Sequence, residues 1–149
     1  MIKVKSLASN NYIHVVAAII WMPDNSNRFL ISERQKGKHL HGYWELPGGK
    51  LETGESRLHA LHRELIEEIN IVPVEISEFM QIGHQYEDRN ILLDVWQVFS
   101  FEGQLRALED QKIKWVAVDQ LDKFRFPDAD LPVLKAIKSN ERAEKGHPL

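Results

Sequence analysis

The sequence predicts an α+β domain in which several strands surround one central helix and a second helix lies near the C-terminus. Strand-like apolar runs recur along the chain, the segment after Gly54 has helical periodicity, and 149 residues with 43% hydrophobic content suit one compact core. No internal repeat or linker interrupts this pattern. We therefore expect a single domain over residues 1–149, with a frayed polar tail at 139–149.

Two strands are predicted in the first part of the chain. Ile13–Trp21 is an apolar run with β-branched residues, and Arg28–Glu33 alternates between polar and apolar residues. The polar segment Asp24–Asn27 between them has the composition of a turn. We therefore expect these two strands to pair as a hairpin.

Three further strands and a final helix are predicted after the central helix. The strands are Phe79–Tyr86, Ile91–Phe101 and Ile113–Val118, and the polar residues 88–90 form a turn between the first two. An amphipathic helix is predicted at Leu131–Lys138. Strands are therefore predicted both before and after the central helix along the chain, an order that is typical of a layered α+β domain.

The central helix has two chemically different faces. At about 100° per residue, four aliphatic residues fall on a stripe that we expect to bury against a sheet: Leu58, Leu61, Leu65 and Ile69. Three acidic residues fall within an arc of about 100° on another face: Glu64, Glu67 and Glu68. Ser56 suits the N-cap position, and Asn70 can end the helix in the left-handed conformation.

The acidic face is suited to a divalent cation. Like charges at these spacings repel by about a few tenths of a kcal/mol per pair in an isolated helix, and a bound cation would reverse that sign. Ligands that are all oxygen suit Mg²⁺ or Mn²⁺, and the Pro-Gly-Gly bend at residues 47–49 would let a backbone carbonyl approach the ion. The alternative is a solvated acidic face that carries only weak ion pairs.

The spacing of these residues resembles the Nudix box, the signature of hydrolases that cut nucleoside diphosphates linked to another moiety. It contains Gly49, five residues, Glu55, seven residues, and the segment Arg-Glu-Leu-Ile-Glu-Glu-Ile-Asn-Ile at 63–71. Asn70 stands where the pattern has glycine, which is a tolerated swap in a left-handed position. Four further segments resemble the MutT branch of the family: ISERQ (31–35), WELPGGKLE (44–52), DRNI (88–91) and FPDADLPVLKAI (126–137). The resemblance implies the Nudix fold, a mixed and partly curled sheet sandwiched between helices (α/β/α).

The resemblance assigns five residues to a metal site with Mg²⁺ (or Mn²⁺) as cofactor: Gly49 through its carbonyl, Glu64, Glu67, Glu68 and Glu109. Glu109 is placed by counting from the turn at 102–103, and an ordinary exposed loop acid is an equal alternative for it. Either Glu64 or Glu109 would act as the general base, since the sequence does not separate the base from the metal ligands. Glu55 and Arg63 resemble a supporting pair in which the arginine orients the glutamates.

The resemblance also assigns the residues that bind the substrate. Arg34 and Lys50 match basic positions that contact the phosphates, with solvated surface as the alternative for each. Leu46 stands where an aromatic residue often lines the nucleobase pocket, and core packing is its alternative. Arg89 would border the same pocket.

Asp130 is the most consequential departure from the MutT pattern. Relatives that prefer oxidised guanine generally have asparagine there, whereas relatives that act on cytidine triphosphates have aspartate. An ionised aspartate only accepts hydrogen bonds, but a raised pKa would let Asp130 donate one. The alternative is that Asp130 caps the final helix.

The resemblance implies Mg²⁺-dependent hydrolysis of (deoxy)nucleoside triphosphates to a nucleoside monophosphate and pyrophosphate. Oxidised guanine nucleotides (8-oxo-dGTP) and cytidine triphosphates are the candidate substrates. One alternative is hydrolysis of another nucleoside diphosphate derivative, and a second is a binding module that holds nucleotides without cutting them. A net charge of -3 and a pI near 6.2 argue against a nucleic acid polymer as the partner.

The remaining composition bears on compartment and assembly. No apolar run approaches the roughly 18 residues of a membrane span, and the first residues lack the apolar core of a secretory signal. The absence of cysteine excludes disulfides and agrees with a reducing compartment. We therefore expect a cytoplasmic protein that spans no membrane and is a monomer or homodimer.

Overall fold

Two β-sheets and two α-helices are seen in the computed structural model, which describes residues 11–24, 26–35, 37 and 42–140. The strands are β1 (Tyr12–Ile20), β2 (Arg28–Glu33), β3 (Trp44–Glu45), β4 (Gly48–Lys50), β5 (Val72–Gln85), β6 (Asn90–Glu102) and β7 (Ile113–Ala117). The helices are α1 (Arg57–Ile69), the short 3-10 helices η2 (Val118–Lys123) and η3 (Asp128–Asp130), and α2 (Leu131–Asn140). The predicted α+β class is therefore confirmed.

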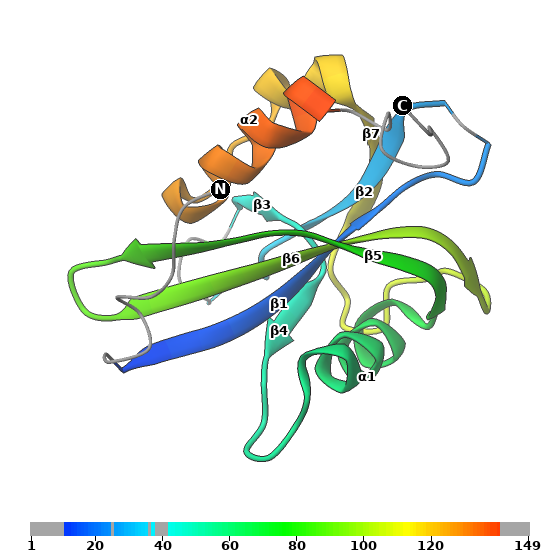
Figure 1. Cartoon of the computed structure of the whole chain (residues 1–149). Coiled ribbons are helices and arrows are strands. Elements are labelled where there is room, and N and C mark those ends of the chain that lie inside the picture. The colour runs from blue at the N-terminus through cyan, green and yellow to red at the C-terminus, as the bar shows by residue number, and fades with distance from the viewer. Residues whose placement is uncertain (1–10, 25, 36, 38–41, 141–149) are drawn as a thin grey trace.

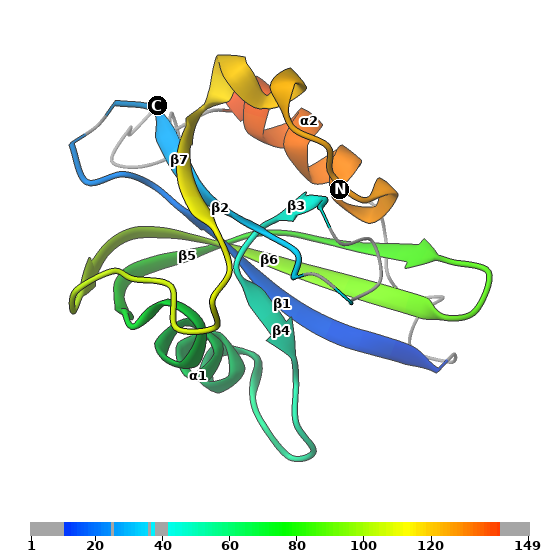
Figure 2. The same cartoon turned by 180° about the vertical axis from the view of Figure 1, so that it is seen from behind.

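The strands form one mixed sheet and one antiparallel sheet. The larger sheet has the order β4-β1-β6-β5, in which β1 and β6 are parallel and the other neighbours are antiparallel. The smaller sheet has the order β3-β2-β7. Figures 1 and 2 show α1 against one side of the larger sheet and α2 on the other side. This is the helix–sheet–helix layering that the resemblance implies.

Strand β1 contributes to two separate hydrophobic cores, because successive side chains of a strand point to opposite faces. Val16, Ala18 and Ile20 pack in the core that contains α1, whereas Ala17 and Ile19 pack in the core that contains α2. All five side chains are buried. Burial on both faces explains why this strand has a continuous apolar run instead of an alternating pattern.

The prediction that the first two strands pair as a hairpin is wrong, except for one bridge next to the turn. Trp21 and Phe29 form one antiparallel bridge, but β1 belongs to the larger sheet and β2 to the smaller sheet. Along its length β1 pairs with β6 instead, beginning with Tyr12 opposite Asn90. The composition of a turn reports only that the chain reverses, whereas burial of both faces of β1 selects a partner far away in the sequence.

The other predicted strands and the final helix are present with shifted boundaries. Strand β5 begins at Val72, before the predicted start at Phe79. Helix α2 includes Ser139 and Asn140, which were expected in the frayed tail. Residues 141–149 of that tail lie outside the described residues.

Strand β4 occupies the glycine segment that was predicted as a bend. Gly48 pairs with Ala17 of β1, and Gly49 pairs with Val16. A Cβ atom at position 48 would overlap the carbonyl oxygen of Val16. Glycine therefore allows the backbone of β4 to approach β1 closely enough to extend the sheet.

Helix α1 begins and ends at the predicted residues. The hydroxyl of Ser56 accepts a hydrogen bond from the backbone N–H of His59 at 3.1 Å, and Asn70 adopts the left-handed conformation with φ 66°. The N–H of Asn70 donates to the carbonyl of Ile66 at 3.2 Å. Three residues of the predicted aliphatic stripe are fully buried: Leu61, Leu65 and Ile69. Asparagine thus fulfils the capping role that glycine usually has.

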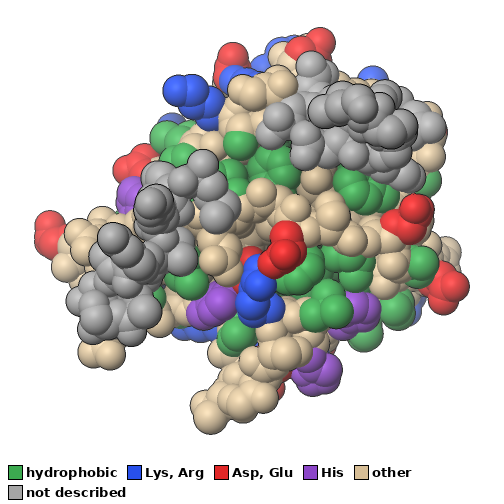
Figure 3. All heavy atoms as spheres, viewed as in Figure 1, with side chains coloured by type: hydrophobic (Ala, Val, Ile, Leu, Met, Phe, Trp, Pro, Cys, Tyr) green, Lys and Arg blue, Asp and Glu red, His purple; other side chains and the backbone are tan. Residues whose placement is uncertain are grey.

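The fourth residue of the stripe, Leu58, is not buried as predicted, since it is 44% exposed. In this first turn Arg57 makes the contact with the sheet, and its guanidinium lies 4.8 Å from the centre of the Trp96 ring. Figure 3 shows hydrophobic and histidine side chains at the surface in the region of α1, where Ile66 is also 45% exposed. The periodicity located the buried face correctly but not the point where the helix leaves the sheet.

A buried ion pair joins the start of α1 to the larger sheet. Asp94 of β6 is fully buried and accepts hydrogen bonds from Nε and Nη2 of Arg57 at 2.6 and 2.9 Å. Nε2 of His14 lies 2.8 Å from the same carboxylate. Desolvation raises the pKa of Asp94, but the hydrogen bonds from Arg57 and His14 together outweigh it and lower this pKa to about 2. The ionised carboxylate therefore ties α1 to β6.

We predict that the Asp94 ion pair makes folding stability fall at acidic pH. The folded-state pKa of about 2 lies below the ordinary value of 3.8. The ion pair therefore contributes its full stabilisation at a pH above 3.8, and this stabilisation is lost as the pH falls from 3.8 through the folded-state pKa of about 2. The linked free energy is about 2 kcal/mol. Urea unfolding of the wild type and Asp94→Asn between about pH 7 and pH 2.5 measures it, and the stability difference should shrink with falling pH.

The matched control is Asp122→Asn, because the side chain of Asp122 is 88% exposed in its pair with Lys138. Its stability difference from the wild type should be small throughout. A difference between wild type and Asp94→Asn that is the same at every pH would contradict the role given to the ion pair.

Candidate active site

One cavity of about 580 Å³ contains most of the predicted site residues. It lies between β1, β4, α1, the β5–β6 turn and the segment that leads into α2. The predicted residues in its wall are Arg34, Leu46, Gly49, Lys50, Glu64, Glu68, Arg89, Glu109 and Asp130. Glu55, Arg63 and Glu67 are not in this wall. The structure therefore brings together predicted residues from six separate parts of the chain.

Glu64 lies directly against the backbone of β4. A Cβ atom at Gly49 would overlap the carboxyl group of Glu64, so the absence of a side chain there makes room for the acid. Desolvation raises the pKa of Glu64, and the charges of Glu67 and Glu109 act in the same direction, while Arg63 opposes them. The carboxyl group of Glu64 therefore lies directly beside the backbone of Gly49, with no side chain between them.

Glu68 is the most strongly perturbed acid of the cavity. It is 9% exposed, and desolvation followed by the charges of Glu45 and Glu109 raises its pKa to about 9. The acid is thus protonated at neutral pH in the absence of a cation. A cavity that brings together carboxyl groups with raised pKa values is suited to a hard divalent cation, because the cation would favour their ionised forms.

Glu67 does not join Glu64 and Glu68 in the cavity wall. Its side chain is 57% exposed and lies 3.2 Å from Nη1 of Arg63. Among the described residues, no three histidine, aspartate or glutamate side chains are close enough together to hold a metal ion. Mutual repulsion explains the spread, since without a cation each carboxylate gains more from an arginine than from another acid.

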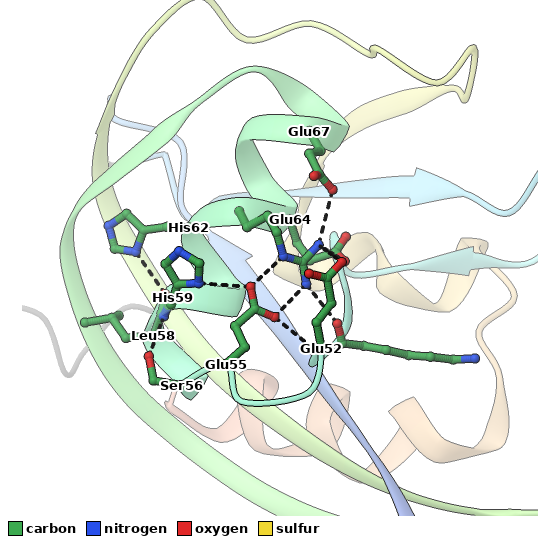
Figure 4. Close-up of polar contacts among 10 residues, drawn as sticks. Glu52, Glu55, Ser56, Leu58, His59, His62, Glu64 and Glu67 are labelled. Carbon is green, nitrogen blue, oxygen red and sulfur yellow. Dashed lines mark hydrogen bonds and ion pairs between the residues drawn. The ribbon is translucent and has the colours of Figure 1, made fainter.

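Arg63 is the centre of an ion-pair network on the outer side of the site. It donates two hydrogen bonds to Glu55 at 2.6 and 2.9 Å, one to Glu64 at 3.0 Å, and one to the backbone carbonyl of Lys50 at 3.0 Å. Figure 4 shows Glu55, Glu64 and Glu67 around this guanidinium. The bonds from Arg63 lower the pKa of Glu55 to about 2. The network fixes the direction of two acids of the motif.

The cavity is also lined by apolar and basic groups. Leu46 is 6% exposed and packs in the core with α2 while also lining the cavity; its contact with a nucleobase stays a prediction. Nη1 of Arg34 bonds to Glu45 at 2.6 Å, and the residue Lys50 is exposed at the rim. Within the described part of the chain, Nε of Arg89 is buried without a hydrogen-bond partner.

Asp130 lies at the end of η3 and is 8% exposed. Desolvation and then the charge of Glu45 raise its pKa to about 7, and Arg34 opposes the shift. This carboxyl group is therefore close to an even mixture of protonated and ionised forms at neutral pH. It can both donate and accept a hydrogen bond in the cavity.

Among the cavity residues that were not predicted as site residues are Glu45, Tyr86 and Gln111. Glu45 raises the pKa of both Glu68 and Asp130, and its position beside the glycine segment was the available signal. The hydroxyl of Tyr86 accepts a hydrogen bond from the N–H of Ala129 at 3.2 Å. No sequence signal marked Tyr86 or Gln111, because their positions depend on contacts between distant segments.

Comparison with known proteins gives consistent matches. The chain is 35% identical to the 8-oxo-dGTP diphosphatase of Escherichia coli K12 over 115 residues, which are 77% of this chain and 89% of that protein. It is 37% identical to the CTP pyrophosphohydrolase of Escherichia coli K12 over 127 residues, which are 84% of this chain and 90% of that protein.

Solved structures agree with these relatives. One structure, from a structure and function analysis of MutT from Aliivibrio salmonicida and Vibrio cholerae, superposes with a TM-score of 0.75 at 39% identity and covers 87% of this chain and 98% of that one. The model of the NUDIX domain family matches residues 16–136, a range that includes β4, α1 and the cavity. This chain therefore belongs to the NUDIX domain family.

Proposed function

We propose that this protein hydrolyses (deoxy)nucleoside triphosphates to a nucleoside monophosphate and pyrophosphate, with Mg²⁺ as the cofactor. The chain is a hydrolase that acts on phosphoric anhydride bonds, as its family and relatives indicate. The observation that carries the finer proposal is that Glu64, Glu68 and Glu109 line the same cavity as the buried Asp130. A nucleotide bound in this cavity would have its phosphates beside the carboxyl groups that hold the ion.

Five residues would hold the divalent ion: Gly49 through its carbonyl, Glu64, Glu67, Glu68 and Glu109. When bound, the ion supplies positive charge that neutralises the phosphate oxygens as charge develops during displacement at phosphorus. Glu67 would serve as a ligand only after leaving its ion pair with Arg63. The oxygen-only set favours Mg²⁺, with Mn²⁺ as a substitute.

The protein's own groups would carry out binding and proton transfer. Glu64 or Glu109 would accept the proton of the attacking water, and desolvation, which raises the pKa of Glu64, makes its carboxylate a stronger base than an exposed one. Arg34 and Lys50 would bind the phosphates. Arg63 would keep Glu64 in its direction through the contacts described above.

Asp130, Leu46 and Arg89 would form the nucleobase pocket. A protonated Asp130 would donate to a base carbonyl, and an ionised one would accept from a base N–H. Because its pKa is about 7, both 8-oxo-dGTP and cytidine triphosphates are proposed substrates, as the names of the two Escherichia coli relatives suggest.

Two alternatives retain the same cavity. The first is hydrolysis of another nucleoside diphosphate derivative, and the second is a module that binds nucleotides without cutting them. Glu64 and Glu68 in one wall argue against the second alternative.

No helix among the described residues is long and apolar enough to cross a membrane. The cytoplasmic location and the monomeric or dimeric state stay predictions.

A substrate panel tests the proposed function. Products are separated and quantified by chromatography with 8-oxo-dGTP, dCTP, CTP, 5-methyl-dCTP and ADP-ribose, with added Mg²⁺ and with a chelator in its place; a triphosphate gives a nucleoside monophosphate and pyrophosphate, whereas ADP-ribose gives AMP and ribose 5-phosphate. Turnover of triphosphates that disappears with the chelator is expected. No turnover together with a nucleotide-induced rise in Tm would favour the binding module, and turnover of ADP-ribose alone would favour the other diphosphate class.

We predict that Glu67→Gln lowers kcat by about 100-fold, because it removes a charged ligand from the ion that stabilises the transition state. Stability should change little, since the side chain is 57% exposed and crowded by other acids. Steady-state kinetics and Tm measure the two effects. The control is Glu52→Gln, at an acid that is 69% exposed and 3.7 Å from Arg63. Equal activity of the two variants would remove Glu67 from the metal site.

We predict that Asp130→Asn changes which base is preferred, with a smaller effect on turnover of the best substrate. An amide always offers a donor and an acceptor, whereas the carboxyl group alternates between forms near neutral pH. The kcat/KM ratio of 8-oxo-dGTP to CTP should therefore lose its dependence on pH around 7. Asp128→Asn, at an exposed acid in the same 3-10 helix, is the control. An unchanged ranking would place Asp130 outside the base pocket.

A further inference from the structure

The loop at 103–112, which joins β6 to β7 and carries Glu109, folds back across the C-terminal end of α1. The N–H of Leu108 donates to the carbonyl of Glu68 at 3.0 Å, and the N–H of Arg106 donates to the carbonyl of Ile69 at 3.1 Å. The last carbonyls of a helix have no partner within the helix itself. The loop backbone therefore completes the helix and is held next to it.

The side chain of Gln111 makes the link between this loop and the acids of the cavity. Its Oε1 accepts a hydrogen bond from the backbone N–H of Glu109 at 2.9 Å, while its Nε2 donates to the backbone carbonyl of Glu68 at 3.1 Å. Asp110, between Glu109 and Gln111, has a φ of 60°, a left-handed conformation that reverses the chain locally. One amide group thereby bridges the backbones of two acidic residues.

The carbonyl of Glu109 is bonded from the other side. Nε2 of Gln35, which follows β2, donates to it. Both backbone polar groups of Glu109 are therefore bonded by glutamine side chains, one from its own loop and one from the opposite wall of the cavity. The residue itself is exposed, so these bonds, and not burial of its side chain, hold the backbone from which the carboxyl group extends.

We propose that Gln111 is a positioning residue that holds the backbone of Glu109 next to that of Glu68 in the cavity wall. The inference rests on the proposed function in so far as Glu109 serves there as a metal ligand or general base. Glutamine suits this role because one amide supplies an acceptor and a donor together. A methionine of similar length supplies neither, and an asparagine is one methylene too short to reach both partners.

The test compares Gln111→Met and Gln111→Asn with Gln104→Met. Gln104 has an exposed side chain in the same loop, and its backbone carbonyl accepts a hydrogen bond from Nδ2 of Asn70 at 2.8 Å, a bond that any side chain at 104 leaves available. Three measurements are made: hydrogen exchange of the Glu109 amide by NMR, Mn²⁺ affinity by calorimetry without nucleotide, and kcat and KM for the best triphosphate.

In both Gln111 variants we expect faster exchange of the Glu109 amide, about tenfold weaker Mn²⁺ binding and about tenfold lower kcat, with KM for the nucleotide little changed. The control should match the wild type in all three. The Asn variant keeps the test decisive if the Met variant does not fold.

Amide exchange and Mn²⁺ affinity equal to the control would overturn the positioning role. If the wild type hydrolyses no nucleotide, the proposed function fails, but these two measurements still decide the inference about Gln111.

Discussion

The burial of neighbouring carboxyl groups constrains the candidate site, because desolvation raises the pKa of Glu64 and Glu68 and the charges of nearby acids add to this shift. Burial of Leu61 and Leu65 against the larger sheet places Glu64 and Glu68 in the cavity wall whatever their charge. Each buried leucine stabilises the fold by about 1.5–3 kcal/mol, whereas like charges at this spacing cost about a few tenths in an isolated helix. The apolar face therefore prevails, and the cost appears as the raised pKa of Glu68.

Two arginines of α1 form ion pairs with acidic residues, and each pair has a different structural effect. Arg57 is bonded to the buried Asp94 and anchors the start of the helix to β6. Arg63, further along, is bonded to Glu55 and Glu64 at the cavity rim. The first interaction sets where the helix lies, and the second sets where its acids point. Neither neutralises Glu68, which leaves the interior of the cavity suited to a cation.

Much of the candidate site could be predicted from spacing along the chain. Gly49 and Glu64 meet because β4 and α1 are neighbours in sequence, and Asn70 caps the helix because its left-handed tendency is a local property. The spread of Glu67 towards Arg63 was not foreseen. A helical wheel gives directions of side chains, but the choice of ionic partner depends on burial and on which counter-charges are present.

The sequence by itself determined the α+β class, the two faces and ends of α1, and the family signature, because periodicity, capping and fixed spacing are properties of short segments. Only the tertiary structure decided that β1 pairs with β6 and not with β2. It also decided that Glu45, Tyr86 and Gln111 share one cavity with the motif. Such contacts join distant segments: the apolar run of β1 indicates burial on both faces, but it does not specify which distant strand or loop packs beside it.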